Sequence, residues 1–239
     1  MASLLILKTG STYPGIRQQF GDFDQWFEKR LAPHEVTICD VTAEPPPGMP
    51  TDWQGILVTG SPSMVTDREH WSERAAAWLA EAVRAQVPVL GVCYGHQMLA
   101  QALGGEVGFR EQGRESGTFD VRLTTRGESD PLLGQLSAVF PAHLTHAQSV
   151  LRLPPGACLL AESDGDPHQA FRIGHHAWGV QFHPEFGEQI MTAYLAIQAP
   201  RLEAEGQDPQ QLQAAVRPTS EATSLLIRFA DYVRNLGNG

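Results

Sequence analysis

The sequence predicts an α/β fold in which a mostly parallel central sheet is flanked by helices. Short apolar runs of strand length alternate with segments of helical period through about the first hundred residues. These runs are apolar throughout, which is typical of parallel strands covered on both faces. The second half carries alternating patterns as well, and these predict a small antiparallel addition to the sheet.

In the first half, buried strands are predicted at residues 4–7, 36–39, 55–60 and 87–92. Residues 70–84 are rich in alanine and predict a helix. Another amphipathic helix is predicted over residues 16–31, because apolar side chains recur there at helical spacing, at Ile16, Phe20, Phe23, Phe27 and Leu31.

In the second half, strands are predicted at residues 119–123, 157–161, 170–173 and 178–182. Helices are predicted at 188–197 and 224–235, with a polar stretch between them. No long linker separates these elements. We therefore expect one domain over residues 1–198, with a C-terminal helical extension over residues 199–239 packed on it.

Composition excludes several classes of partner and site. The 239 residues carry a net charge of −10 and no polybasic run, so we expect neither a nucleic-acid nor a membrane partner. Three cysteines without a CxxC pair suit neither a disulfide framework nor a zinc site. No apolar stretch approaches the ~20 residues of a membrane span. The sequence thus predicts a reduced, cytoplasmic protein.

The most informative segment surrounds Cys93, which Gly91 and Gly95 flank at two positions on either side. Small residues at these positions are what a sharp strand-to-helix turn around a nucleophile requires. Cys93 would then lie at a helix N-terminus, which favours a thiolate, and the Tyr94 N–H would be an oxyanion donor. The motif alone is also compatible with a buried structural cysteine.

A second segment supplies the partners that a cysteine nucleophile needs. His183 and Glu185 follow the apolar run at 178–182. Side chains two positions apart on a strand lie on one face, so the Glu185 carboxylate can orient the His183 imidazole. This pair predicts a general base and its orienting group for Cys93.

Together, residues 56–63, 91–97 and 179–185 resemble three ordered motifs of the class I glutamine amidotransferases. The chain is most similar to stand-alone members that resemble the amidotransferase domain of GMP synthase, over roughly residues 3–190. The resemblance implies the flavodoxin-like fold of that family. It also implies a catalytic triad made of Cys93, His183 and Glu185.

The same resemblance implies an oxyanion hole formed by the backbone N–H groups of Ser61 and Tyr94. It implies a site for the glutamyl α-amino and α-carboxylate groups at Gly60, Ser63, Gln97, Ala147 and Gln148. Two of these positions depart from the family pattern. Ser61 replaces a glycine, which is costly only if its φ is positive. Gln148 replaces an aspartate, and offers a neutral acceptor where a carboxylate could pair with an ammonium.

The nine histidines show no metal-ligand pattern. His143 and His146 lack the i, i+4 spacing of a helical site, and the adjacent His175 and His176 would point apart. We therefore expect no metal and no cofactor. His96, just after the nucleophile, is predicted to pack or cap rather than to act as the base.

These observations predict an enzyme that hydrolyses the γ-glutamyl amide bond of glutamine through a thioester and releases ammonia. The chain has no G-x-x-x-x-G-K-[ST] loop, so the ammonia would pass to a separate synthetase. One alternative is a free-standing hydrolase of γ-glutamyl peptides or amides. The other is a glutamyl-binding regulatory module with little turnover, because fold does not determine function.

Overall fold

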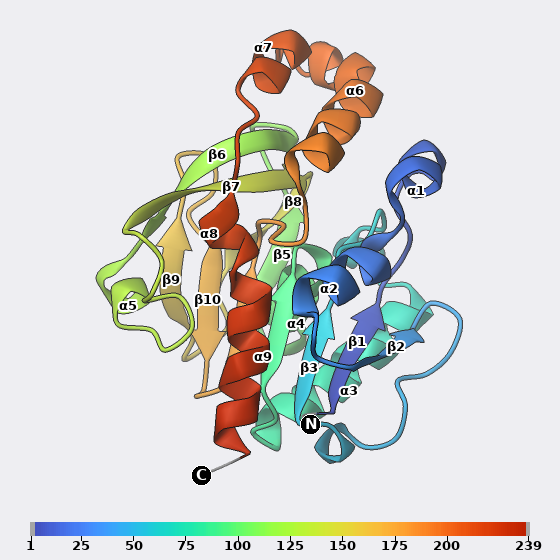
Figure 1. Cartoon of the computed structure of the whole chain (residues 1–239), viewed down its shortest axis with the longest axis vertical. Coiled ribbons are helices and arrows are strands. Elements are labelled where there is room, and N and C mark those ends of the chain that lie inside the picture. Colours follow the sequence, from blue (N-terminus) through green and yellow to red (C-terminus); the bar gives the residue numbers. More distant parts are fainter. Residues whose placement is uncertain (1–2, 238–239) are drawn as a thin grey trace.

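The computed structural model describes residues 3–237, which are built around one nine-stranded sheet (Figure 1). Five neighbouring strands pair in parallel, in the order β2 (Val36–Asp40), β1 (Leu4–Lys8), β3 (Gly55–Val58), β4 (Val89–Val92) and β11 (Ala177–Val180). The sheet continues with antiparallel pairing through β10 (Ala170–Ile173), β9 (Cys158–Glu162), β6 (Glu115–Leu123) and β7 (Val139–His146). The predicted α/β class is confirmed, and the antiparallel addition extends the parallel sheet.

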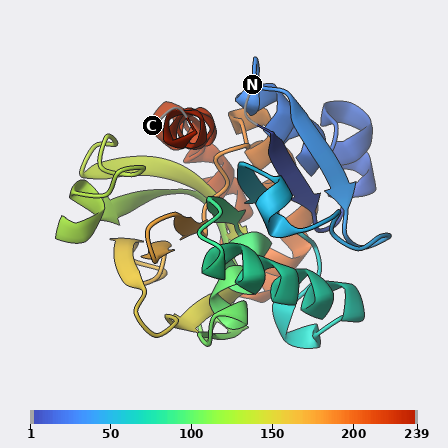
Figure 2. The same ribbon diagram turned by 90° about the horizontal axis from the view of Figure 1, so that it is seen from below.

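Helices cover both faces of the parallel half, as Figure 2 shows from below. One layer contains α2 (Phe23–Leu31) and α9 (Leu225–Leu236), and the other contains α3 (His70–Arg84) and α4 (Tyr94–Ala102). The other helical segments are α1 (Pro14–Phe20), η1 (Pro50–Asp52), η2 (Val65–Asp67), α5 (Thr125–Glu128), α6 (Glu188–Ala204), α7 (Pro209–Ala214) and α8 (Ser220–Thr223). A separate antiparallel pair consists of β5 (Glu106–Phe109) and β8 (Gln148–Arg152).

Strand β1 illustrates why the apolar runs lack polar alternation. Leu4 and Ile6 pack into the core beneath α2 and α9, whereas Leu5 and Leu7 pack into the core beneath α3 and α4. Successive strand residues point to opposite faces, and both faces are covered here. All four side chains are therefore buried.

The prediction of a single helix over residues 16–31 is wrong. Gly21 has a φ of +87° and ends α1, and Asp22 then caps α2. The Asp22 carboxylate accepts from Phe23 N at 2.9 Å, and the Gln25 side chain accepts from Asp22 N at 3.0 Å. Helical spacing continues across the break, so the apolar pattern alone does not reveal it.

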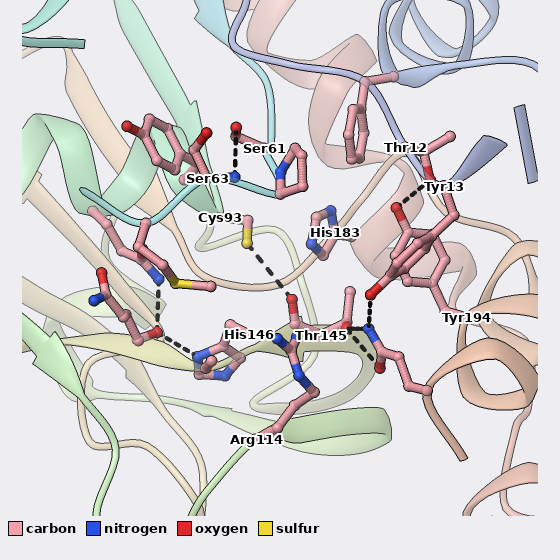
Figure 3. Close-up of a pocket in the computed structure, with 18 of the residues that line it drawn as sticks. Thr12, Tyr13, Ser61, Ser63, Cys93, Arg114, Thr145, His146, His183 and Tyr194 are labelled. Carbon is pink, nitrogen blue, oxygen red and sulfur yellow. Dashed lines mark hydrogen bonds between the residues drawn. The ribbon is translucent and has the colours of Figure 1, made fainter. Parts of the chain in front are cut away.

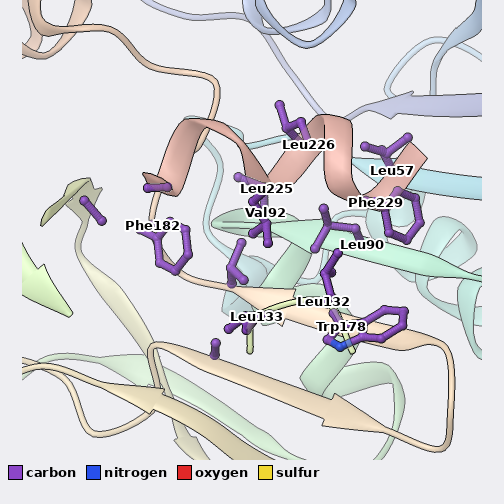
Figure 4. Packing of buried hydrophobic residues seen from close by; sticks show 14 of the residues in the cluster. Leu57, Leu90, Val92, Leu132, Leu133, Trp178, Phe182, Leu225, Leu226 and Phe229 are labelled. Carbon is purple, nitrogen blue, oxygen red and sulfur yellow. The ribbon is translucent and has the colours of Figure 1, made fainter. Parts of the chain in front are cut away.

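The C-terminal region belongs to the main core. Helix α9 packs Leu225, Leu226 and Phe229 against the sheet, where they meet side chains of β3, β4 and β11 (Figure 4). Helix α6 extends past its predicted end and through residue 198. The division into a 1–198 domain and a 199–239 extension stays a prediction.

Two further observations bear on the predicted site and partners. Ala147 and Gln148, expected to bind the glutamyl group, lie where β7 ends at His146 and β8 begins at Gln148, with Ala147 between the two strands. Across residues 3–237, no helix combines the length and apolar character needed to cross a bilayer.

Candidate active site

Cys93 lies at a sharp turn between β4 and α4. Its φ is +52° and its ψ is −101°, a backbone conformation that costs of order 1–3 kcal/mol for a residue with a Cβ. The flanking glycines permit the turn. A Cβ at Gly91 would lie 2.4 Å from the Gly95 carbonyl oxygen, and a Cβ at Gly95 would lie 2.7 Å from Val58 Cβ. The predicted elbow is therefore present, and its strain is concentrated at Cys93.

His183 and Glu185 form a close pair, but not in the way the strand pattern predicted. Strand β11 ends at Val180, so both residues lie in the turn that precedes α6. His183 Nδ1 is 2.7 Å from Glu185 Oε1, and His183 N donates to His143 O at 2.8 Å. The expectation that His183 and Glu185 share one face of a strand was wrong, because a turn brings the two side chains together.

The environment of His183 favours a protonated ring. Burial lowers its pKa, but the negative charges of Glu185 and of a Cys93 thiolate outweigh burial and raise the pKa to about 10. The His183 ring stacks on Phe186, with ring centroids 4.2 Å apart. The Phe23 ring is nearly parallel to that of His183, with centroids 6.5 Å apart. His183 Nε2 is buried and has no hydrogen-bond partner among residues 3–237. It is thus free to act on a group in the adjoining pocket.

A pocket of about 260 Å³ opens onto Cys93 and His183 (Figure 3). The Cys93 thiol lies 3.8 Å from the carbonyl oxygen of Thr145, to which it donates. Several segments far apart in the chain line the pocket, and the side chains include Thr12, Tyr13, Ser63, Gln97, Arg114, Gln148, Tyr194 and Gln198. Only part of this lining is covered by the motifs identified in the sequence.

The backbone amides expected to form an oxyanion hole border this pocket. Tyr94 is the first residue of α4, so its N–H has no partner within the helix. Ser61 does not have a positive φ, so a serine fits there without strain, and its hydroxyl accepts from Ser63 N at 3.1 Å. A Cβ at Gly60 would lie 3.0 Å from His183 Cε1. Both Ser61 and Tyr94 line the pocket.

Of the predicted glutamyl-binding residues, Ser63, Gln97, Ala147 and Gln148 line the pocket, whereas Gly60 does not. Gln97 Nε2 donates to Gln148 O at 2.7 Å and to Gln181 Oε1 at 2.9 Å, so both of its amide hydrogens are used. Gln148 Nε2 donates to Thr66 Oγ1 at 2.5 Å. Gln148 Oε1 is buried and has no partner within the described part of the chain. This oxygen is an available acceptor beside Ala147, which also lines the pocket.

Next to Gln148 lies a buried charged cluster that the sequence did not reveal. Possible ligand atoms of Glu115, His146 and Asp166 lie within 4.8 Å of one another. Arg110 Nη1 lies 3.3 Å from Glu115 Oε2 and 3.9 Å from Asp166 Oδ2, so one internal cation lies beside both carboxylates. His146 bridges Glu115 Oε2 and Gln148 O, each at 2.8 Å. The cluster therefore supports the Gln148 backbone, and the absence of a metal stays a prediction.

His96 is buried at the start of α4 and does not line the pocket. Its ring packs against Phe171 with centroids 5.0 Å apart, and burial lowers its pKa to about 4. This position fits the predicted packing role. Arg114, Tyr13, Tyr194 and Gln198 line the pocket without belonging to any motif, so only their place in the fold identifies them.

Comparisons with known proteins agree with this architecture. The family described as "Glutamine amidotransferase class-I" matches residues 24–197. One subunit of the glutamine-hydrolyzing GMP synthase of Halobacterium salinarum is 31% identical over 183 residues, which are 74% of this chain and 93% of that protein. The glutamine-hydrolyzing GMP synthase of Aeropyrum pernix is 35% identical over 169 residues. That match covers 68% of this chain but 31% of the relative, so the chain spans about a third of that protein's length.

Solved structures show the same fold. A glutamine amidotransferase from Thermotoga maritima superposes with a TM-score of 0.75 at 20% identity, covering 97% of both chains. A glutamine amidotransferase from Methylobacillus flagellatus superposes with a TM-score of 0.66 at 24% identity, covering 98% of this chain and 89% of that one. Because the family match spans most of the chain and the Halobacterium relative is covered almost completely, the protein belongs to the class I glutamine amidotransferase family.

Proposed function

We propose that the protein is an enzyme that hydrolyses the γ-glutamyl amide bond of glutamine and releases ammonia. The observation that carries this proposal is the convergence on one pocket of a strained Cys93 and the His183–Glu185 pair. A nucleophile at a helix N-terminus beside a carboxylate-oriented imidazole is the arrangement that acyl transfer through a thioester requires. The family membership supports the same reaction class.

The proposed reaction has two halves. Cys93 Sγ attacks the γ-carbonyl carbon, and the oxyanion accepts hydrogen bonds from the N–H groups of Ser61 and Tyr94. His183 protonates the amide nitrogen, the C–N bond breaks and ammonia leaves. His183 then takes a proton from water as the water attacks the thioester, which releases glutamate and restores the Cys93 thiolate beside protonated His183. Glu185 holds the imidazole orientation throughout.

We further propose that a separate synthetase subunit receives the ammonia. Support comes from the Halobacterium relative, whose name describes one subunit of a GMP synthase. A second candidate is hydrolysis of other γ-glutamyl compounds by this chain alone. It is favoured by polar residues such as Tyr13 and Arg114 on a wall of the pocket.

The test measures ammonia and amine release from glutamine and from a panel of γ-glutamyl amides by the purified protein. Turnover of the amides without a partner favours the free-standing hydrolase, and glutamine turnover that requires a lysate fraction favours a partnered amidotransferase. Binding of glutamyl ligands without turnover in either condition contradicts an enzymatic role.

The same assay tests the nucleophile. We expect Cys93→Ala to abolish turnover and Cys39→Ala to preserve it, because Cys39 is buried away from the pocket. Burial also raises the pKa of the Cys39 thiol to about 11, which keeps it unreactive. An electrophilic glutamine analogue should label Cys93. Labelling of Cys39 or Cys158 instead would overturn the assignment.

A further inference from the structure

Arg114 is a partly buried cation in the catalytic pocket, and no carboxylate among residues 3–237 lies within 4.0 Å of its guanidinium to form an ion pair. It lines the same pocket as Cys93, and Figure 3 shows its side chain pointing toward the cavity. Its Nε is buried and has no hydrogen-bond partner within those residues. An arginine in this state is arranged for an anionic ligand, because a desolvated cation without a partner is costly.

The neighbouring carboxylates are committed to other groups. Glu205 Oε2 accepts from the backbone N of Arg114 at 2.7 Å, and Glu205 Oε1 lies 3.2 Å from Arg201 Nε. Glu115, the next residue along the chain, pairs with Arg110 and His146. Burial lowers the pKa of Arg114, which agrees with a cation short of compensating charge. The Arg114 guanidinium is therefore available to bind a ligand.

Arg114 is anchored on the α6 side of the pocket. Its backbone N is held by Glu205, and its backbone O accepts from Gln207 Nε2 at 2.7 Å, just beyond the end of α6. From the same helix, Tyr194 and Gln198 face the cavity. Gln198 Nε2 in turn lies 3.4 Å from the hydroxyl of Tyr13.

This wall is continuous with His183. The His183 ring stacks on the Phe186 ring, with centroids 4.2 Å apart. The Phe186 and Tyr194 ring centroids are 4.9 Å apart, and those of Tyr194 and Tyr13 are 5.4 Å apart. Because His183 protonates the departing nitrogen in the proposed reaction, we expect substituents on that nitrogen to extend along this wall. Gln97 and Gln148, which also line the pocket, are the residues that we propose to hold the glutamyl end. Ammonia has no substituent, so glutamine itself makes no use of Arg114.

We infer that Arg114 binds a carboxylate on the amine portion of the substrate, so that the site accepts γ-glutamyl amino acids and prefers them to γ-glutamyl amides without that carboxylate. This inference rests on the proposed function and specifies its substrate class. In a γ-glutamyl amino acid the carboxylate carbon lies about 2.5 Å from the scissile nitrogen. The planar guanidinium matches a carboxylate with two parallel hydrogen bonds.

The chemistry differs from glutamine hydrolysis only in the leaving group. Cys93 Sγ forms a bond to the γ-carbonyl carbon, the C–N bond breaks, and the amino acid leaves with a proton from His183. Water then cleaves the thioester, and the products are glutamate and a free amino acid. No cofactor or co-reactant other than water is needed.

The experiment compares glutamate release from γ-glutamylglycine, γ-glutamylglycinamide and glutamine. These substrates share the glutamyl group, and the first two differ only at the terminal carboxylate. We expect the wild-type kcat/KM for γ-glutamylglycine to exceed that for γ-glutamylglycinamide by about tenfold or more, mainly through KM. Equal values for the two in the wild-type protein would overturn the inference without any variant.

Variants then identify the residue responsible. Arg114→Gln should lower kcat/KM for γ-glutamylglycine by at least about tenfold more than for the other two substrates, and Arg114→Lys should recover part of the loss. The control Arg234→Gln removes an exposed cation of α9 that pairs with Asp231 and should leave all three rates unchanged. An equal loss of all three rates in Arg114→Gln would assign Arg114 to the shared glutamyl group and overturn the inference. Failure of the wild-type protein to hydrolyse any of the three, both alone and with the lysate fraction, would instead overturn the proposed function.

Discussion

At the scale of single residues, the site depends on charges that are buried beside one another. His183 lies between the Glu185 carboxylate and the Cys93 sulfur, and both of its ring nitrogens are shielded from water. In such surroundings an imidazolium persists only while its negative partners remain. The protonation of His183 is therefore the property most sensitive to substitution.

Glu185→Gln should shift the pH profile of the reaction. Burial lowers the pKa of His183, and Glu185 is the strongest of the groups that raise it to about 10. Without that charge the pKa falls, so the imidazolium that protonates the leaving group is lost at lower pH. We expect the alkaline limb of kcat/KM to move to lower pH and kcat to fall about 10²-fold. An unchanged alkaline limb would show that Glu185 does not control His183.

The His183–Glu185 pair should also behave as one unit. We expect His183→Ala to lower kcat more than Glu185→Gln does, because the turn still positions the imidazole when residue 185 is glutamine. The double variant should be little worse than His183→Ala, since groups that act together give non-additive losses. A double-mutant cycle in which the two losses multiply would contradict joint action.

Gln148→Asp tests how the glutamyl end is recognised. Gln148 Oε1 is buried without a partner in the described residues and lines the pocket. A carboxylate there would add an ion pair to a substrate α-ammonium, worth of the order of 1 kcal/mol or several-fold in KM. We expect glutamine to gain more than γ-glutamyl amides with blocked α-amines. If KM changes equally for substrates with free and with blocked α-amines, residue 148 does not bind the ammonium group.

At the scale of elements, the start of α2 fixes a segment that borders the pocket. The Asp22 carboxylate accepts from Phe23 N and from Thr12 N, each at 2.9 Å, and lies 3.0 Å from Lys8 Nζ. Thr12 lines the pocket, and its hydroxyl lies 2.5 Å from the Tyr194 hydroxyl. A single helix cap thereby connects β1, α2 and the α6 wall of the site.

Asp22→Ala should destabilise the protein by about 2–3 kcal/mol, because a helix cap and a buried acceptor are lost together. Asp22→Asn keeps the cap and should cost less. The matched control Asp24→Asn removes the other carboxylate on Lys8, at 2.9 Å, without touching the cap, and should cost below about 1 kcal/mol. Urea unfolding measures all three, and equal costs for Asp22→Ala and Asp24→Asn would contradict the capping role.

The Asp22 carboxyl should also make the stability of the protein depend on pH. Burial raises the pKa of Asp22, but hydrogen bonds from Thr12, Lys8 and Phe23 outweigh it and the pKa is lowered from 3.8. A depressed folded pKa contributes stability above the unfolded value, and that contribution is lost as the pH falls through the folded pKa. Asp22→Asn should therefore flatten the loss of stability at acid pH. An acid limb as steep as that of the wild type would contradict this assignment.

At the scale of the whole molecule, α9 is an integral part of the core. Phe229 is fully buried, with its ring 6.3 Å from that of Trp178 on β11. Phe229→Ala should cost about 3–5 kcal/mol in the free energy of unfolding. Leu236→Ala, at the exposed end of the same helix, should change it by less than about 0.5 kcal/mol. Similar small costs for both would indicate that α9 folds as an appendage.

Local patterns in the sequence predict most of the parallel half. Residues 70–84 form α3 with the predicted ends, and the strands at 4–7 and 36–39 occur with one added residue each. These elements are determined by apolar spacing and by turn residues close to them in the chain. The break at Gly21 was missed because the apolar spacing continues through it, although the cap formed by Asp22 and Gln25 is itself a local signal.

The sequence by itself also determined the elbow, because two glycines around Cys93 express a local steric requirement. The motifs name His183 and Glu185 as partners of Cys93, but only the tertiary structure decided how they reach it. Strand β11 pairs with β4 so that Val180 lies opposite Val92, and Cys93 N donates to Val180 O at 2.9 Å. This pairing joins segments far apart in the chain and brings the His183 turn to the elbow. The order of the strands and the position of Arg114 in the pocket depend on how the whole core packs, and no local spacing in the sequence encodes that packing.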